Sequence, residues 1–285
     1  MSEYTNALRA RILAEALPHI SRYYGKTIVV KYGGNAMTSD DLKKQVMNDI
    51  ALLNKVGVRI VLVHGGGPEL SNLMERVGKK PEFINGLRVT DQETIDLAQM
   101  VLAGKINKTL VNLIQAAGGM AVGLSGMDAR LIEAKIRDEK YGFVGDVTKI
   151  NTEVINDLLD KGYIPVISTL GCDQDGNTYN INGDTAAGKI AGALNAERMI
   201  LLTDVRGVMK DMNDESSLIP ELTINEARKL KEDGTISGGM IPKVKCCIDA
   251  VEAGVEAVVI LDGRVPHAIL METLTDEGAG TMIRR

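Results

Sequence analysis

Two lysines beside glycines are the residues of this sequence best suited to chemistry. Lys31 follows residues 27–30, which favour a β-strand, and precedes two glycines. Ligands of open α/β sheets bind beyond the carboxyl ends of the strands, so the Lys31 ammonium should point into a ligand crevice. Lys243 lies in GGMIPKV, in the first turn of an expected helix. A cation near a helix N-terminus is electrostatically misplaced unless an anion compensates, so Lys243 also indicates a bound anion.

A strand followed by three glycines predicts an anion site within residues 58–77. Residues 58–63, VRIVLV, are mostly branched and apolar, which suits a strand buried on both faces. Apolar residues then recur every three to four positions, so a helix begins directly after the glycines. Its backbone N–H groups and positive dipole end favour a carboxylate or a phosphate. An ordinary tight turn is the alternative, although a turn rarely needs three glycines.

Three other stretches carry polar residues that could contact a ligand. Asp184 is expected at a helix N-cap, with Asn180 and Asn182 nearby. Capping alone would explain this aspartate, but its carboxylate could also hold cationic groups. Arg88, in NGLRVT, has the planar fork that matches a carboxylate, and an exposed loop arginine is the alternative. Residues 203–207 end another buried strand, where a nucleotide could lie.

Several other chemistries lack the residues that they need. The histidines stand only at positions 19, 64 and 267, and no histidine–cysteine group has zinc spacing, so triad and zinc chemistry are not expected. The stretch 183–190, GDTAAGKI, nearly fits a phosphate-binding loop but has isoleucine in place of the hydroxyl residue. Two lysines, glycine-built anion sites and one carboxylate suit phosphoryl transfer by positioning and charge neutralisation.

The composition predicts a soluble protein of the cytoplasm. Its 285 residues carry a net charge of −5 without a basic stripe, which argues against nucleic acid or an anionic membrane as the main partner. The 3 cysteines are an odd number and are expected as free thiols in a reducing compartment. No run approaches the ~20 apolar residues of a membrane span, and residues 1–24 do not resemble a signal peptide.

Strands and helices are expected to alternate, beginning with a parallel βαβ unit at residues 27–63. Helices are expected at 7–23, 40–56, 92–102, 106–117, 152–161, 185–194, 224–232, 241–253 and 266–273. Further strands are expected at 120–124, 163–168, 197–203, 257–261 and 281–283, hairpins within 130–147 and 171–182, and loops at 81–90 and 207–221. Pro18 should kink or end the first helix unless it starts a second one. That helix is either a partner-binding arm or packs on its own domain.

Six motifs, taken in order, cover essentially the whole chain: KYGG, VHGGGP, NGLRVT, NINGD, LLTDVRGV and GGMIPKV. Together they resemble the amino-acid kinase family, and in particular its arginine-sensitive, hexameric branch. The resemblance implies an α/β fold, a three-layer αβα sandwich with a mainly parallel central sheet, two lobes and an N-terminal helix. Residues 1–24 would form the interlacing helix. Residues 25–182 would bind the acyl amino acid and dimerise, and residues 183–285 would bind ATP and the effector.

The resemblance also implies an activity. ATP, with Mg²⁺ held mainly by the nucleotide and no metal site of the protein's own, would phosphorylate the side-chain carboxylate of N-acetyl-L-glutamate. The product would be N-acetyl-L-glutamyl 5-phosphate, in arginine biosynthesis, with feedback inhibition by L-arginine. This nucleophile, with an unperturbed pKa of ~4.3, is already ionised and needs no general base. A homohexamer built as a trimer of dimers is expected, and a PII-type signalling protein binds some members.

The motifs carry the family's roles onto individual residues. Phosphoryl transfer would involve Lys31, Lys243, Asp184, Gly34 and Gly66. The acyl amino acid would contact Gly66, Gly67, Arg88, Asn180 and Asn182. The nucleotide would contact Thr203, Asp204, Gly207, Val208, Met209 and Gly239. L-Arginine would contact His267, Glu277 and Gly280. One departure is His19, which stands where the branch carries a tyrosine close to the effector.

Two alternatives remain beside this reading. A related kinase could act on another carboxylate, such as a carrier-linked 2-aminoadipate, but the N-terminal helix and the effector motif argue against it. A catalytically silent effector-binding module is the other alternative. Such a module has no need of two lysines that face a phosphoryl group.

Overall fold

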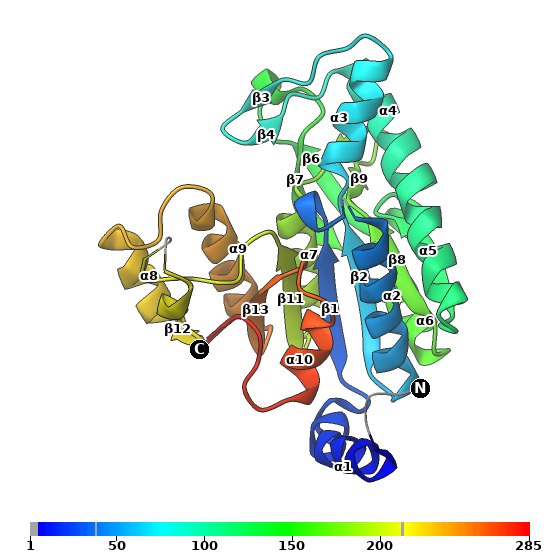
Figure 1. Ribbon diagram of the computed structural model, residues 1–285. Helices are drawn as coiled ribbons and strands as arrows, with labels where there is room; N and C mark the ends of the chain where they lie inside the picture. The colour runs from blue at the N-terminus through cyan, green and yellow to red at the C-terminus, as the bar shows by residue number, and fades with distance from the viewer. Residues whose placement is uncertain (1–4, 38, 212–213) are drawn as a thin grey trace.

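An eight-stranded sheet forms the centre of the computed structural model, which describes residues 5–37, 39–211 and 214–285 (Figure 1). Its strand order is β12-β14-β13-β11-β1-β2-β8-β5. The strands are β1 (Thr27–Tyr32), β2 (Arg59–His64), β5 (Ala121–Ser125), β8 (Ile164–Ser168), β11 (Arg198–Thr203), β12 (Glu221–Thr223), β13 (Ala257–Asp262) and β14 (Thr281–Arg284). Among these strands only the β13–β14 pair is antiparallel, so the expected mainly parallel sheet is confirmed.

Helices cover both faces of this sheet and complete three layers. One face carries α2 (Asp40–Lys55), α3 (Gly67–Arg76), α4 (Gln92–Gln99), α5 (Asn107–Ala116) and α10 (Ala268–Leu274). The other carries α6 (Glu153–Asp160), α7 (Gly183–Ala193), α8 (Ile224–Glu232) and α9 (Met240–Glu252). Successive strand residues enter opposite cores, as Val29 and Val30 of β1 do. This is why the strands read as continuous apolar runs.

A smaller mixed sheet lies beside the main sheet, at the end that carries α3. It contains β6 (Ile132–Ile136), β7 (Gly145–Ile150), β9 (Leu170–Cys172) and β10 (Thr178–Asn180). Its two antiparallel pairs are joined by the parallel β6–β9 pair. Both hairpins expected within 130–147 and 171–182 are therefore confirmed. The loop expected at 81–90 contains a further hairpin, β3 (Phe83–Ile84) with β4 (Leu87–Arg88). The loop expected at 207–221 contains the short helix η5 (Glu215–Ser217). Strand β12 begins at residue 221, the last residue of this expected loop.

Residues 92–116 form one helical run, not the two helices expected from the sequence. The π-helical segment η2 (Met100–Ile106) joins α4 to α5 without a break. Its wider turn keeps Leu102 and Ile106 directed at the core. This segment packs against the glycine turn after β2, as described below.

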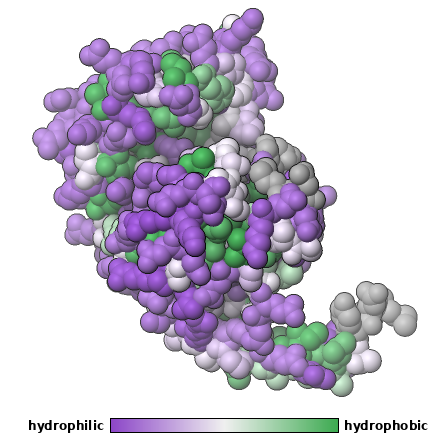
Figure 2. All heavy atoms as spheres, turned by 90° about the vertical axis from the view of Figure 1, so that its left-hand side faces the viewer, coloured by the Kyte–Doolittle hydropathy of each residue, from purple (hydrophilic) through white to green (hydrophobic). Residues whose placement is uncertain are grey.

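Helix α1 (Asn6–Tyr23) projects from the lower end of the molecule in Figure 1 and continues through Pro18. The expectation that Pro18 ends the helix is wrong, because proline removes only its own N–H and the flanking turns hold. Four apolar side chains of α1 are exposed by 41 to 71%: Leu8, Ile12, Leu13 and Leu17. Figure 2 shows a green, hydrophobic patch at the lower end of the molecule, the end at which α1 lies in Figure 1. No helix in the described part of the chain has the length and apolar character that crossing a bilayer requires.

Candidate active site

An ion pair between Lys31 and Asp184 lies at the carboxyl end of the central strand. Lys31 is the penultimate residue of β1, and its Nζ lies 2.9 Å from Oδ1 of Asp184 in the first turn of α7. The two side chains are only 13% and 22% exposed. The contact is a close ion pair without the alignment of a hydrogen bond. The carboxylate therefore holds the ammonium at this end of the strand.

Glycines leave space along the Lys31 side chain. A β-carbon at Gly33 would lie 3.4 Å from Lys31 Nζ, and one at Gly183 would lie 3.4 Å from its Cε. Gly34 has a left-handed φ of +63°, and no neighbouring atom lies within 4 Å of where its β-carbon would stand. Bare backbone beside an ammonium is an arrangement that favours an anion.

Asp184 is not the N-cap residue that the sequence suggested. The cap is Asn182, whose side-chain oxygen accepts from the backbone N–H groups of Asp184 at 3.1 Å and Thr185 at 3.0 Å. The helix begins at Gly183 because that residue already adopts helical geometry, which moves Asp184 to the second helical position. Capping by Asn182 leaves the Asp184 carboxylate available to Lys31.

Lys243 and Asp184 line one cavity of about 530 Å³, together with Asn182 and Asn85. Lys243 reaches it from the first turns of α9. Of the two lysines, only Lys31 forms an ion pair with Asp184 within the described residues.

Cys246, which the sequence analysis passed over, attaches α9 to the start of α7. Its Sγ donates to the carbonyl oxygen of Asp184 at 3.1 Å, and burial raises the pKa of the thiol to about 12, so the donor proton is retained. The spacing of three between Lys243 and Cys246 places both on one helix face, and this signal could have revealed the contact.

Gly66 is required by packing as well as by any ligand. It is the N-cap of α3, and a β-carbon there would overlap Cδ1 of Ile106 and lie 2.7 Å from Cδ2 of Leu102 in the π-helical segment. The space beside Gly67, in contrast, is open. The sequence suggested that the three glycines leave space for a ligand beside the backbone. At Gly66 that space is occupied by the side chains of Ile106 and Leu102.

Arg88 is buried, which excludes the exposed loop arginine. Its Nη2 donates to Ser71 Oγ at 2.8 Å and to the carbonyl oxygen of Gly67 at 3.0 Å, and its guanidinium lies 4.7 Å from the ring centre of Phe83. Burial lowers the pKa of Arg88. The arginine is therefore held rigidly against the first turn of α3, next to the candidate substrate residue Gly67.

Thr90 connects Asn180 to Arg88. Asn180 Nδ2 donates to Thr90 Oγ1 at 3.4 Å, and that hydroxyl donates to the carbonyl oxygen of Arg88 at 3.0 Å. The structure thus brings together Arg88, Gly67 and Asn180, three of the predicted substrate residues. The sequence analysis did not single out Thr90, although it ends the motif NGLRVT.

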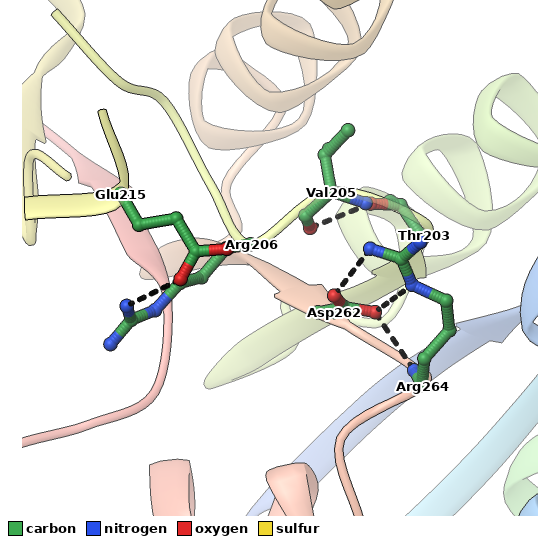
Figure 3. Close-up of polar contacts among 6 residues, drawn as sticks. All are labelled: Thr203, Val205, Arg206, Glu215, Asp262 and Arg264. Atoms are coloured by element: carbon green, nitrogen blue, oxygen red, sulfur yellow. Dashed lines mark hydrogen bonds and ion pairs between the residues drawn. The ribbon is translucent and has the colours of Figure 1, made fainter. Parts of the chain in front are cut away.

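Figure 3 shows the ends of β11 and β13, where the candidate nucleotide residue Thr203 lies beside Asp262. Thr203 ends β11, and its Oγ1 accepts from the N–H of Val205 at 3.0 Å; Asp204 follows it. Asp262 stands opposite Thr203 and receives the Arg264 guanidinium through two hydrogen bonds of 2.9 and 2.8 Å. Burial opposes ionisation of Asp262, but its bonds from Arg264 prevail and lower the pKa of the carboxyl.

Residues 207–209 pack beneath this region. A β-carbon at Gly207 would lie 3.0 Å from the backbone nitrogen of Thr281, and the N–H of Val208 donates to Thr281 Oγ1 at 2.8 Å. Met209 forms an isolated bridge with Leu218. Gly239, in contrast, is the N-cap of α9 with open space beside it. The sequence did not point to Asp262 as a candidate site residue, because the strand expected at 257–261 ended one residue before it, whereas β13 includes it.

The candidate effector residues lie near α10. His267 is its N-cap, has a left-handed φ of +59°, and places Nδ1 2.7 Å from Oδ1 of the buried Asp49. Burial raises the pKa of Asp49 although His267 acts in the opposite direction. Glu277 is exposed. A β-carbon at Gly280 would overlap the carbonyl oxygen of Ile260, so packing accounts for this glycine.

His19 reaches the same segment from α1. Its Nε2 lies 3.3 Å from Oδ1 of Asp276, between α10 and β14. The N-terminal helix and the segment that carries the effector motif are therefore neighbours.

A mainly parallel sheet with a lysine–aspartate pair and glycine turns at its carboxyl edge is suited to binding an anionic ligand. The model of the amino acid kinase family matches residues 26–262, and the chain belongs to this family. It is a kinase and uses ATP.

Its relatives carry a narrower name. Acetylglutamate kinase of Caldanaerobacter subterraneus subsp. tengcongensis is 53% identical over 97% of this chain and 93% of its own length. The acetylglutamate kinases of Clostridium beijerinckii and Nostoc punctiforme are 55% and 52% identical, over 96% and 99% of this chain and 98% and 96% of their own lengths.

Solved structures share the fold. An N-acetylglutamate synthase from Neisseria gonorrhoeae, complexed with coenzyme A and N-acetyl-glutamate, is 28% identical with a TM-score of 0.84; the match covers 97% of this chain but only 63% of the synthase. Carbamate kinase from Giardia lamblia bound to AMP-PNP has a TM-score of 0.66 at 20% identity, over 92% of this chain and 99% of that kinase. The second likeness concerns the fold alone.

Proposed function

We propose that this kinase transfers the γ-phosphoryl group of ATP to the side-chain carboxylate of N-acetyl-L-glutamate, giving N-acetyl-L-glutamyl 5-phosphate in arginine biosynthesis. The observation that carries the proposal is the Lys31–Asp184 pair beside bare glycine backbone, in a chain more than half identical to several acetylglutamate kinases. The name of those relatives supports the acceptor, and the site supports the reaction.

The chemical problem is electrostatic, because a carboxylate must approach a polyanion. In this proposal Lys31 and Lys243 neutralise the transferring group, and Asp184 holds the Lys31 ammonium in place. Backbone N–H groups of Gly34 and Gly66 contact phosphoryl oxygens. When bound, ATP supplies the transferable group, and Mg²⁺ coordinated mainly by its phosphates reduces the remaining repulsion.

Substrate binding falls to the buried arginine and its neighbours. Arg88 receives the α-carboxylate of N-acetyl-L-glutamate, because its guanidinium is already oriented by Ser71 and Gly67. Asn180 and Asn182 contact the remainder of the acyl amino acid. In this scheme residues 25–182 bind the acyl amino acid and form the dimer contact, whereas residues 183–285 bind the nucleotide around the ends of β11 and β13.

Feedback inhibition by L-arginine and assembly into a hexamer belong to the same proposal. The His19–Asp276 contact supports an effector site where α1 meets residues 267–280, around His267, Glu277 and Gly280. A related synthase has been solved with L-arginine. The exposed apolar side chains of α1 support docking of this helix on another copy, which would build a hexamer from three dimers. A PII-type signalling protein is a further proposed partner, and the cytoplasm is the proposed location.

Trapping of the acyl phosphate with hydroxylamine tests the activity. N-Acetyl-L-glutamate, glutamate, aspartate and N-acetyl-2-aminoadipate are assayed in parallel with ATP, each with and without L-arginine. Hydroxamate from N-acetyl-L-glutamate alone, suppressed by arginine, is expected. If hydroxamate forms equally with and without arginine, the effector proposal is wrong and the proposed kinase activity stands. If only N-acetyl-2-aminoadipate gives product, N-acetyl-L-glutamate is not the acceptor.

Deletion of residues 1–23 tests the role of α1. The truncated chain should form smaller particles in light scattering, remain active and lose its response to arginine. Hexamers that survive the deletion would contradict the assembly role, and co-elution of a PII-type protein with the full chain tests that partner.

A further inference from the structure

The imidazole of His64 lies beneath the glycine turn that is proposed to bind the phosphoryl group. His64 is the last residue of β2 and is fully buried. Its Nδ1 lies 3.0 Å from the carbonyl oxygen of Gly65, and its Nε2 lies 3.1 Å from Nδ2 of Asn107, the first residue of α5. The ring therefore connects the turn to a helix on one face of the sheet.

The partners of Asn107 decide which ring nitrogen of His64 carries the proton. Asn107 Nδ2 also lies 2.8 Å from the carbonyl oxygen of Val166 and 3.0 Å from that of Leu124. Carbonyl oxygens only accept, so this amide nitrogen is a donor and presents N–H groups, not a lone pair, to Nε2 of His64. The Gly65 carbonyl oxygen also only accepts, so the neighbouring Nδ1 of His64 is the ring nitrogen that donates. The ring proton is then on Nδ1 and is donated to Gly65.

The surroundings also keep this ring uncharged. Burial lowers the pKa of His64 to about 4; the carbonyl oxygen of Gly65 opposes the shift, and nearby Lys108 adds to it. At neutral pH the imidazole is therefore neutral, with one donor and one acceptor nitrogen.

The hydrogen bond to Gly65 controls the direction of the next N–H. A trans peptide directs its carbonyl and its N–H to opposite sides, and every peptide between described residues is trans. With the Gly65 carbonyl held on the buried ring, the N–H of Gly66 points to the opposite side of the turn, away from that ring. A Gly–Gly link has no β-carbons to restrict rotation of this peptide, so a specific partner must select the orientation.

We propose that His64 is a positioning residue, whose Nδ1–H holds the Gly65 carbonyl so that the Gly66 N–H is fixed in the direction of the transferring phosphoryl group. The proposal rests on the proposed function, in which Gly66 donates to a phosphoryl oxygen. The neighbouring π-helical side chains of Leu102 and Ile106 limit sideways movement of the same turn. A donor that is fixed before the reaction stabilises the transition state more than one that must rotate into place.

A matched pair of variants tests this role. His64→Asn places an amide N–H near the position of Nδ1, whereas His64→Leu has a similar size and no donor. The leucine variant should lose about 10²-fold in kcat, the usual effect of losing one fixed donor, with KM for both substrates within about threefold of wild type. The asparagine variant should recover most of that loss. A leucine variant with the kcat of wild type overturns the proposal.

Nitrogen NMR of the unaltered protein gives a readout independent of activity. The chain has only 3 histidines, and the signal of His64 is the one missing from His64→Asn. A neutral ring with its proton on Nδ1 is expected at pH 7, and a proton on Nε2 or a charged ring overturns the proposal. A wild-type enzyme that fails to phosphorylate N-acetyl-L-glutamate while its ring carries the Nδ1 proton contradicts the proposed function instead.

Discussion

Replacing Asp184 by asparagine removes the charge from the ion pair with Lys31 while keeping the size of the side chain. At the observed separation of 2.9 Å, the direct attraction is about 6 kcal/mol for an effective dielectric constant near 20. Desolvation offsets part of this, and loss of one partner of a buried pair typically costs about 3–5 kcal/mol. Both side chains retain some exposure, so we expect about 3 kcal/mol of lost stability.

Thermal and urea unfolding measure this loss. For a chain of this size, about 3 kcal/mol corresponds to a fall in Tm of roughly 6–12 °C. The same substitution at Asp160, whose exposed carboxylate pairs with Arg59, is the control and should cost less than about 1 kcal/mol. Turnover should fall about 10²-fold in Asp184→Asn, because the Lys31 ammonium loses its fixed position.

The double variant Lys31→Met, Asp184→Asn tests the cause. With both charges removed, no unpaired ammonium remains buried, and stability should return to within about 1 kcal/mol of wild type. Activity should stay lost, because the phosphoryl-facing ammonium is absent. A double variant no more stable than Asp184→Asn would refute the assignment of this loss to the ion pair.

Three further results are expected. Lys243→Ala should lower kcat about 10²-fold and leave the Kd for N-acetyl-L-glutamate nearly unchanged in calorimetry. The control Lys229→Ala, on the exposed face of α8, should change neither kcat nor Kd. Gly280→Ala should lower stability by about 2 kcal/mol in urea unfolding, because the added methyl group overlaps the carbonyl oxygen of Ile260. The folded pKa of His64 is about 4 and its ordinary value is 6.5, so the unfolded chain binds more protons between these values. Stability should therefore fall by about 3 kcal/mol as pH drops through this window, and less in His64→Asn.

A different outcome would contradict each of these three predictions. Equal loss of turnover and binding in Lys243→Ala would make that lysine a ground-state binder. An unchanged urea midpoint in Gly280→Ala would mean that the chain there moves aside freely. Identical pH dependence of stability in wild type and His64→Asn would exclude that histidine as the source.

Most of the fold could be predicted from local patterns. The apolar runs that became β1, β2, β8, β11 and β13 favoured strands buried on both faces, because they are short and rich in branched residues. Strand-to-helix alternation then required a parallel sheet with helices on both faces. The position of Lys31 could be predicted in the same way, because a residue near the end of a central parallel strand lies at the carboxyl edge of the sheet.

Errors arose where distant residues decide the local structure. The run from α4 to α5 continues through a π-helical segment, whose side chains occupy the space beside Gly66, and no pattern within residues 92–116 contains that information. The N-cap was placed at Asp184, because the sequence could not show that Asn182 caps α7 while the aspartate pairs with Lys31.

The sequence by itself determined the α/β alternation, the glycine turns and the lysines beside them, since each depends on neighbouring residues in the chain. Only the tertiary structure decided that Arg88 is buried, that Cys246 holds the start of α7 and that His64 lies beneath the Gly65 carbonyl. These contacts join residues on separate elements or depend on how the surrounding elements enclose them. The sequence specifies such contacts through packing of the whole chain, which a local pattern does not reveal.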